Sequence, residues 1–346
     1  MAGGRIVRRK RLRKRRRKLL FSIMIVLFLG MVGYTAFQVA AGQDQGAENG
    51  GYTKNEKEND DKTDFEKEQN KNGDKEQLED NKINVLLVGS DQRDKEVDRT
   101  DTIMIGQYDK DSGETKLVSI MRDTYVNIPG YGYNKINASY AYGDIPLLTK
   151  TIQQNFGIQI DHFAEVNFEG FKHIVDEISP KGIKINVEKR MKYQDNAGDV
   201  NIDLQPGVQR LDGAQLLDYA RFRADAQSDF GRVERQQKVI TRLKEEMLSL
   251  TKIHKIPKAI GMVTSYVNTD MTKAEIGGYG TKFITNHDDN IQKLRIPVEG
   301  SYWNERYEGV GAVLAHNEKT NRDALQEFLG VKKEEVAKKE ESGDAS

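Results

Sequence analysis

Arginine and acidic side chains are concentrated in residues 215–240, QLLDYARFRADAQSDFGRVERQQKVI. We expect a helix to begin after Ser228 or Asp229, because either residue is a good N-cap. At about 100° per residue, this helix carries one apolar stripe with Arg232 and Gln236 at its N-terminal end. The stripe contains Val239, Leu243, Met247 and Leu250, flanked by Ile240. The spacing therefore places a positive charge on a surface that faces the core.

A guanidinium in the first turn of a helix lies beside N–H groups that have no partner within the helix. The helix dipole also favours negative charge at that end, so Arg232 indicates a site for an anion. The alternative is that Arg232 and Arg235 pair with Asp225 or Asp229 and only fix a loop.

Further arginines extend this anion site. Arg221 and Arg223 would point in different directions on a helix, so they converge only if the helix ends near Arg221 and the chain becomes extended. Charge-assisted hydrogen bonds contribute ~1.5 to 3 kcal/mol each, and arginine suits the geometry of phosphate. A collective site of this kind would suit a pyrophosphate, and its further members would be Arg93, Arg122, Arg232 and Arg235.

Two aspartates bracket a polar loop, DQRDKEVDRTD, between two expected strands. Asp91 and Asp101 would suit Mg²⁺, which takes oxygen ligands and commonly relies on one or two carboxylates while substrate phosphates complete its shell. The alternative for these carboxylates is a salt bridge with Arg93 or Arg99.

Other kinds of site find no support in the sequence. The chain has no cysteine, which excludes disulfides, thiol catalysis and thiolate metal sites. The five histidines show no paired metal spacing, and no P-loop, nucleophile elbow or HExxH motif occurs. The glycine clusters GYGY (130–133) and GGYG (277–280) are interpreted as turns with aromatic contacts.

Charge is strongly segregated along the chain, although the formal net charge is +0. Residues 1–18 are basic and residues 19–41 are apolar. The first 22 residues of this apolar segment carry no charge and would span roughly 33 Å as a helix, enough to cross a bilayer. We interpret residues 19–41 as an uncleaved transmembrane anchor, with a cleavable signal peptide as the alternative.

The positive-inside rule places residues 1–18 in the cytoplasm and the chain beyond the anchor outside the cell membrane. A basic run beside a membrane helix is an orientation signal, so direct nucleic-acid binding is not expected. Residues 42–81 are polar and cannot bury a core, so we interpret them as a disordered linker. Residues 331–346 are interpreted as a disordered tail, which leaves residues 82–330 as the folded domain.

Strand-like and helix-like patterns alternate through the expected domain. Short apolar runs predict strands at 83–89, 102–108, 116–121, 183–187 and 293–298, the second and third forming a hairpin. Apolar spacing predicts helices at 146–156, 168–178, 213–221, 231–250 and 321–329. The alternation indicates a three-layer α/β/α domain with a central mixed sheet, preceded by the single transmembrane helix.

Six motifs follow one another behind the predicted anchor: GSDQR (89–93), RTDT (99–102), SIMRDTYV (119–126), KINASYAYG (135–143), LDGAQLLDYARFR (211–223) and DFGRVERQQ (229–237). In residue types and order they resemble the LytR-CpsA-Psr family, and the resemblance covers nearly all of residues 84–250. Two departures are Met121, where the family usually has proline, and the SPKG sequence at 179–182, which replaces its usual Gly-Gly. We expect both to reshape a lipid-binding groove without removing charge from the site.

The resemblance implies a membrane-anchored phosphotransferase that moves a cell-wall glycopolymer, such as wall teichoic acid, from an undecaprenyl-pyrophosphate-type carrier to peptidoglycan. By motif, Asp91 and Asp101 correspond to the family's Mg²⁺-linked acids, with Mn²⁺ as an alternative ion. The implied pyrophosphate-binding set comprises Arg93, Arg122, Arg221, Arg223, Arg232, Arg235 and Gln236, together with Lys135 and Asn137 of the neighbouring KIN element.

In such a transfer, a peptidoglycan hydroxyl attacks the phosphorus that bears the polymer and expels the lipid monophosphate. Mg²⁺ and the arginines would neutralise the developing charge, and Asp91 is a candidate acceptor of the hydroxyl proton. The apolar faces of the 168–178 and 231–250 helices are candidates to line an isoprenoid tunnel. Two alternatives remain: a non-catalytic regulator that senses the lipid pyrophosphate, and a hydrolase in which water replaces the sugar. The residues assigned to catalysis are Asp91, Arg93, Asp101, Arg122 and Arg221.

Overall fold

The computed structural model describes residues 81–90, 100–195, 200–224, 228–248, 261, 265–285 and 291–331. The predicted basic segment (1–18), the anchor (19–41), almost all of the linker (42–81) and almost all of the tail (331–346) lie outside these residues. No helix within the described part of the chain is both long and apolar enough to span a bilayer.

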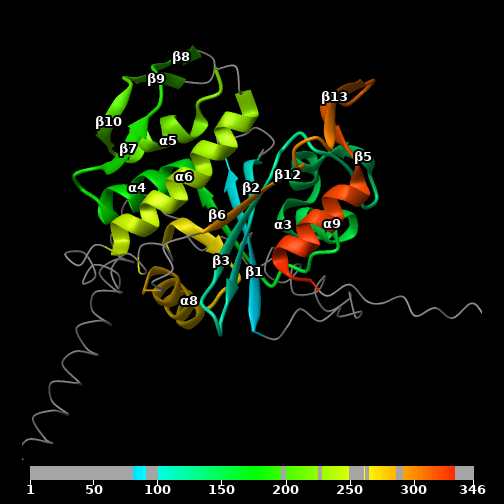
Figure 1. The fold of residues 1–346 in the computed structure, drawn as a ribbon, viewed down its shortest axis with the longest axis horizontal. Coiled ribbons are helices and arrows are strands. Elements are labelled where there is room, and N and C mark those ends of the chain that lie inside the picture. The colour runs from blue at the N-terminus through cyan, green and yellow to red at the C-terminus, as the bar shows by residue number, and fades with distance from the viewer. Residues whose placement is uncertain are drawn as a thin grey trace, which may run out of the picture.

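A six-stranded mixed sheet forms the centre of the domain (Figure 1). In spatial order the strands are β11 (Val267–Thr269), β6 (His162–Asn167), β1 (Lys82–Ser90), β2 (Thr100–Asp109), β3 (Thr115–Ile120) and β12 (Gln292–Ile296). Strand β1 pairs antiparallel with β2 and parallel with β6, while β3 pairs antiparallel with β2 and parallel with β12. The predicted β2–β3 hairpin is confirmed.

Helices cover both faces of the sheet, which confirms the three-layer architecture (Figure 1). One outer layer contains α3 (Ile136–Phe156) and α9 (Glu318–Leu329). The other contains α4 (Phe168–Ile178), α5 (Gly213–Arg221), α6 (Ser228–Leu248) and, at one end, α8 (Lys273–Thr285).

Four two-stranded units surround the central sheet. Two lie beside the α4–α6 layer: β7 (Ile183–Val187) with β10 (Gly207–Leu211), and β8 (Met191–Asp195) with β9 (Val200–Leu204). Two lie beside α3 and α9: β4 (Tyr125–Ile128) with β5 (Gly132–Lys135), and β13 (Tyr302–Tyr307) with β14 (Gly311–His316).

The helices of the α4–α6 layer have local signals that fix their start points. The Asn167 side chain caps α4 by accepting a hydrogen bond from the Gly170 backbone N–H. Asp212 and Gln215 form a reciprocal capping box at the start of α5. A Cβ at Gly213 would lie 2.3 Å from the carbonyl oxygen of Lys172, so only glycine allows α5 to approach α4 this closely.

Most predicted elements are confirmed, and the differences have physical causes. Helix α3 begins at Ile136 rather than Pro146, because two helical segments join through a kink at Gly143 and Asp144. Helix α6 begins at Ser228, three residues before the predicted start. The predicted turn at 277–280 is wrong: these residues lie within α8. The GYGY cluster at 130–133 spans the turn of the β4–β5 hairpin and the first two residues of β5, and the ring of Tyr131 stacks on that of Tyr142.

Candidate lipid pyrophosphate site

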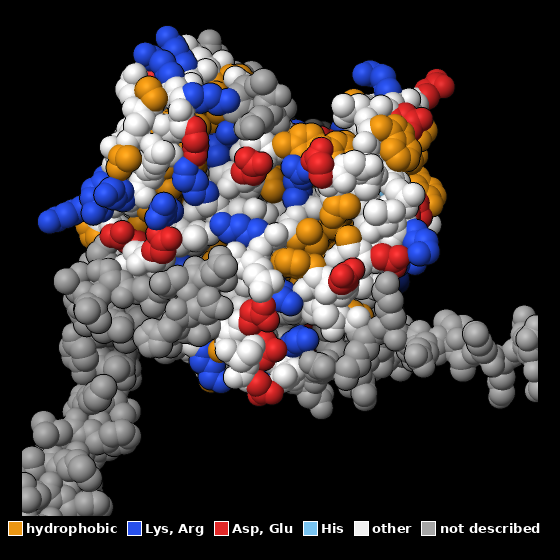
Figure 2. All heavy atoms as spheres, viewed as in Figure 1, with side chains coloured by type: hydrophobic (Ala, Val, Ile, Leu, Met, Phe, Trp, Pro, Cys, Tyr) orange, Lys and Arg blue, Asp and Glu red, His pale blue; other side chains and the backbone are white. Residues whose placement is uncertain are grey.

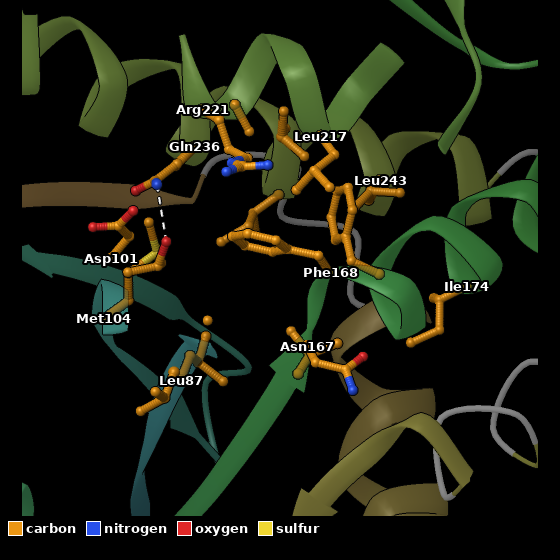
Figure 3. Close-up of a pocket in the computed structure, with 18 of the residues that line it drawn as sticks. Leu87, Asp101, Met104, Asn167, Phe168, Ile174, Leu217, Arg221, Gln236 and Leu243 are labelled. Atoms are coloured by element: carbon orange, nitrogen blue, oxygen red, sulfur yellow. Dashed lines mark hydrogen bonds between the residues drawn. The ribbon is translucent and has the colours of Figure 1, made fainter. Parts of the chain in front are cut away.

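A cavity of about 350 Å³ lies between the sheet and the α4–α6 layer. Strands β1, β2 and β6 form one wall through Leu87, Gly89, Met104, Ala164 and Val166. Helices α4, α5 and α6 form the opposite wall through Phe168, Phe171, Ile174, Leu217, Val239 and Leu243. Figure 3 shows Asp101, Gln236 and Arg221 toward one end of this space and Leu243 and Ile174 toward the other. The cavity therefore joins an apolar chamber to a charged end.

Asp101 lies at the start of β2 and lines the charged end of the cavity. Its Oδ1 atom accepts a short hydrogen bond from Nη1 of Arg122 and lies 3.6 Å from Nη1 of Arg232. Burial raises the pKa of the Asp101 carboxyl, but the charges of Arg122, Arg232 and Arg223 outweigh it and lower the pKa below its ordinary value. Asp101 is therefore an anion held among arginines.

Asp229, in the first turn of α6, is a second acid shared by several arginines. Its carboxylate lies 3.5 Å from Arg232 Nη2, 3.8 Å from Arg122 Nε and 4.0 Å from Arg223 Nη1. Sequence reasoning treated Asp229 as a helix cap or a loop-fixing partner. The Arg232–Asp229 pair of the loop-fixing alternative does exist, but the same arginine also lines the cavity.

Arg232 is the most deeply buried of these arginines, with only 3% of its side chain exposed. Its Nε and Nη1 atoms are buried without a hydrogen-bond acceptor among the described residues. Burial is the main cause that lowers the pKa of Arg232, to about 10, although Asp229 and Asp101 favour its charged form. A buried guanidinium with spare donors is poised to bind an anion that enters the cavity.

Arg221 and Arg223 converge on the cavity in the way that the sequence predicted. Helix α5 ends at Arg221, and Phe222 has extended backbone angles of φ −58° and ψ 130°. Both arginines line the same cavity. The Arg221 guanidinium also lies 4.3 Å from the ring centroid of Phe168, a cation–π contact that orients it over the apolar chamber.

Arg235 and Gln236 differ in their relation to the cavity. Arg235 is buried and donates a short hydrogen bond from Nη2 to the carbonyl oxygen of Phe222, and it does not line the cavity. It therefore holds the residue between Arg221 and Arg223. Gln236 lines the cavity and donates from Nε2 to Oγ1 of Thr102 at 2.9 Å, which ties α6 to β2.

Lys135 and Asn137 contact Arg122 and its neighbour Asp123. The Lys135 ammonium is 2.9 Å from Oδ1 of Asp123, and Asp123 Oδ2 is 3.6 Å from Nε of Arg122. The backbone N–H of Asn137 donates to the carbonyl oxygen of Arg122 at 3.2 Å. The KIN element thus fixes the segment that carries Arg122, and neither side chain lines the cavity.

The predicted metal ligands are only partly within the described residues. Asp91 and Arg93 fall outside them, and no cluster of three acidic, histidine or cysteine side chains suited to a metal occurs in the described part of the chain. Asp101 provides a carboxylate at the charged end of the cavity. One or two carboxylates completed by substrate phosphate oxygens form a shell that Mg²⁺ accepts, so the donor chemistry of Asp101 fits this ion.

The two departures from the family pattern lie away from the cavity lining. Met121 is buried in a small cluster with Val233 and Leu314. Ser179 and Gly182 form a turn in which the Gly182 N–H donates to the Ser179 carbonyl. The expectation that these departures reshape the groove receives no support from the described lining residues.

Comparison with known proteins assigns the family. The model of the LytR_cpsA_psr family matches residues 45–325, and the chain belongs to this family. Regulatory protein MsrR of Staphylococcus aureus (strain COL) is 41% identical over 250 residues, covering 72% of this chain and 75% of MsrR. The polyisoprenyl-teichoic acid–peptidoglycan teichoic acid transferase TagU of Oceanobacillus iheyensis is 30% identical over 247 residues, covering 69% and 73%.

Solved structures of this family have the same fold. The crystal structure of B. subtilis TagV superposes with a TM-score of 0.61 at 25% identity, covering 74% of this chain and all of that one (100%). The structure of the LytR-CPS2A-psr family protein YwtF (TagT) with bound octaprenyl pyrophosphate lipid gives a TM-score of 0.55 at 25% identity, covering 74% and 95%.

Proposed function

We propose that this protein transfers an anionic cell-wall glycopolymer from a polyisoprenyl-pyrophosphate carrier to peptidoglycan. One observation carries the proposal: a single cavity joins an apolar chamber to a cluster of arginines around Asp101. An isoprenyl chain fits the apolar chamber, and a pyrophosphate fits the arginines. The names of TagU and of the octaprenyl-pyrophosphate complex support the same carrier chemistry.

The transfer exchanges the phosphoanhydride bond of the pyrophosphate for a phosphoester bond to the glycan. A sugar hydroxyl of peptidoglycan attacks the phosphorus that bears the polymer, a new P–O bond forms, and the bond to the bridging oxygen breaks. The lipid monophosphate leaves with the bridging oxygen, and the hydroxyl proton passes to a carboxylate, for which we propose Asp91. Arg122, Arg221 and Arg232 stabilise the charge on the phosphoryl oxygens, because they are held in place before the reaction.

Mg²⁺ is the cation that we propose for this reaction, with Mn²⁺ as the alternative. Asp101 and Asp91 would hold it together with pyrophosphate oxygens, and it would supply charge neutralisation at the phosphoryl group. The low pKa of Asp101 keeps this carboxylate ionised, and therefore able to bind a cation, across the physiological pH range.

A membrane location follows from the carrier, because a polyisoprenyl lipid is delivered from a bilayer. We propose that residues 19–41 cross the cell membrane once, with residues 1–18 in the cytoplasm and the domain outside. The linker of residues 42–81 would then let the cavity reach both the membrane and the peptidoglycan.

The test is a reconstitution with the full chain in detergent micelles, Mg²⁺, a lipid-linked polymer and soluble peptidoglycan strands. Mass spectrometry of the products should show the polymer joined to the glycan through a phosphodiester, together with lipid monophosphate. Polymer phosphate without any glycan adduct would instead identify a hydrolase. Arg122→Ala serves as the inactive control, since it removes the arginine that binds Asp101 directly.

A regulator without turnover is the second candidate, because the relative with 41% identity is named as a regulatory protein. In that case the same cavity would retain the lipid pyrophosphate as a signal of envelope state. The reconstitution separates the two functions: a regulator would bind the lipid stoichiometrically and release neither lipid monophosphate nor polymer.

A further inference from the structure

Three tyrosine rings form a row across the β4–β5 and β13–β14 hairpins, with one stacked pair and one tilted pair. The ring centroid of Tyr125 lies 5.4 Å from that of Tyr133 and 4.5 Å from that of Tyr307. Tyr133 is 48% exposed, and the other two are half-buried. Figure 2 shows hydrophobic side chains gathered on the surface over β5 and β13. We call Tyr125, Tyr133 and Tyr307 the tyrosine row.

The tyrosine row lies next to Lys135, the last residue of the ionic network that includes Arg122 and Asp123. Tyr125 is paired with Lys135 across the hairpin, so their side chains project from the same face, and Tyr133 shares that face because it is two residues from Lys135. The Lys135 ammonium is 2.9 Å from Asp123, which lies 3.6 Å from Arg122. A continuous path of ion pairs therefore leads from Asp101 at the charged end of the cavity to Lys135, whose cross-strand neighbour is Tyr125.

Backbone contacts fix the two hairpins to each other and to the segment that carries Arg122. The N–H of Leu314 donates to the carbonyl oxygen of Asp123 at 2.9 Å, and Thr124 and Leu314 form a parallel bridge. The N–H of Ile136 donates to the carbonyl oxygen of Thr124 at 2.8 Å. The row is thus a rigid platform with a set position relative to the phosphoryl-transfer site.

The chemistry of the row suits a carbohydrate. Tyr125 packs between the other two rings, and the outer rings, Tyr133 and Tyr307, each have an apolar face and a hydroxyl at the edge. The fringe is polar: Tyr133 donates its hydroxyl to Glu318 at 3.1 Å, and Asn304 and Arg306 are exposed on β13. A pyranose ring has the complementary character, because its C–H groups form an apolar face and its hydroxyls lie around the rim. An aliphatic partner would leave the polar fringe without hydrogen bonds.

We propose that the tyrosine row binds a glycan chain and that it is the surface on which the acceptor of the proposed transfer lies. Sugar rings pack on the outer rings, Tyr133 and Tyr307, which Tyr125 supports from between them. The chain extends past Lys135 toward Arg122, where its hydroxyl meets the phosphoryl group. The role as acceptor surface rests on the proposed function, whereas glycan binding itself rests only on the row.

Glycan binding can be measured on the full chain in detergent micelles with soluble peptidoglycan strands that have been freed of their peptides. The single tryptophan, Trp303, lies on β13, so its fluorescence reports occupancy of this hairpin. Tyr133→Ala and Tyr307→Ala should each weaken glycan binding at least tenfold, while Tyr133→Phe keeps the ring and should retain affinity within about twofold. The matched control is Tyr193→Ala, an exposed tyrosine on β8.

Octaprenyl pyrophosphate affinity should be the same in all four variants, because the row does not line the cavity. This measurement also shows that each variant is folded. No glycan binding by the unaltered protein, or equal binding by Tyr133→Ala, would overturn the proposal.

Failure of the row and failure of the proposed function give different results. Glycan binding that depends on the tyrosine row, without any polymer transfer, would support the row as a glycan site and contradict the proposed function. Transfer with an unchanged KM for glycan in Tyr133→Ala would support the proposed function and contradict the row as the acceptor surface. The expected result is a raised KM for glycan with an unchanged kcat.

Discussion

The two faces of the central sheet use alternate residues of the same strands, yet one face is filled and the other encloses a cavity. Leu86 and Val88 of β1 belong to a continuous core with α3 and α9, although Val88 also borders the cavity. Leu87 and Gly89, their neighbours on the same strand, line the cavity below α4–α6. The strand pattern alone therefore does not decide whether a sheet face carries a core or a binding site.

What differs is the size of the side chains and the charges that are brought to each face. The filled face packs large groups such as Phe156 and Phe163, both 0% exposed. The cavity face has the small residues Gly89 and Ala164. Even a Cβ added at Gly89 would make a tight contact of 3.1 Å with Cβ of Thr102, so a larger residue at position 89 would crowd this face. Small sheet residues leave an apolar space with arginines at one end, which is the space that the proposed function assigns to an amphipathic lipid.

The largest expected effect is the loss of transfer when an arginine is removed that lines the charged end, as Arg221 does, or that binds Asp101 there, as Arg122 does. Arg122→Ala and Arg221→Ala should each abolish transfer, by at least about 100-fold, because charge-assisted contacts of ~1.5 to 3 kcal/mol are lost at the phosphoryl group. The fold should survive, since neither change removes volume from the core. The measurement is the initial rate of glycan–polymer formation.

Arg190→Ala is the matched control for these arginine variants, because Arg190 is an exposed arginine paired with Asp203 near β8 and β9. Its rate should equal that of the unaltered protein. Comparable turnover in Arg122→Ala or Arg221→Ala would contradict the assignment of the charged end.

The second effect compares the same substitution on the two faces. Leu148 on α3 is fully buried in the filled core, so Leu148→Ala should cost ~2 to 5 kcal/mol of unfolding free energy. Leu243 is only half-buried and borders the cavity, so Leu243→Ala should cost less than about 1.5 kcal/mol. Urea unfolding of both variants checks the difference, and equal losses would mean that the cavity face is packed like a core.

Much of this comparison was predictable from sequence. The apolar stripe with Arg232 at its end gave the direction in which α6 faces, because helical spacing is a local property. The convergence of Arg221 and Arg223 followed from where α5 had to end. The β4–β5 and β13–β14 hairpins were missed, since short polar strands with exposed tyrosines have weak alternation.

The partners within the charged site were harder to predict, because they depend on contacts between distant segments. Asp229 was interpreted as a helix cap, and only the fold shows that Arg122, about a hundred residues earlier, reaches it. Arg235 was placed with the pyrophosphate-binding arginines, whereas it binds the Phe222 carbonyl. One helical turn contains both Arg232 and Arg235, and spacing alone could not separate their roles.

The third effect should follow from filling the cavity from the sheet side. Ala164 of β6 lines it, so Ala164→Leu would occupy space that the isoprenyl chain needs. We expect octaprenyl pyrophosphate affinity to fall about tenfold, or ~1.4 kcal/mol, while stability stays the same or rises slightly. Isothermal titration and thermal unfolding on the same sample measure both quantities. Unchanged affinity would show that the lipid does not use this part of the cavity.

The smallest expected effect is on the pH dependence of stability, and it compares the two ends of the central sheet. His162 lies at the start of β6, away from the arginines. Its Nδ1 is 3.0 Å from Oδ2 of Asp270, the residue that follows the neighbouring strand β11. The hydrogen bond that the Asp270 carboxylate accepts from the His162 ring is the main cause that raises the pKa of His162 above its ordinary value of 6.5, and Glu275 and Asp161 add to it. A histidine with a raised folded pKa stabilises the fold fully below its unfolded pKa.

That contribution should be lost as pH rises through the folded pKa of His162, above 6.5. The charged end should not add to the change, because the lowered pKa of Asp101 confines its loss of stability to pH below its ordinary value of 3.8. His316, whose pKa burial lowers, has the opposite sign, because its contribution to stability rises as the unfolded histidine loses its proton near pH 6.5. The difference in urea midpoint between the unaltered protein and His162→Gln isolates the contribution of His162, and this difference should shrink between pH 6 and pH 9 while octaprenyl pyrophosphate affinity stays the same in both proteins. A difference that does not change with pH would place the titrating group elsewhere, and a loss of lipid affinity in His162→Gln would mean that the two ends of the sheet are coupled.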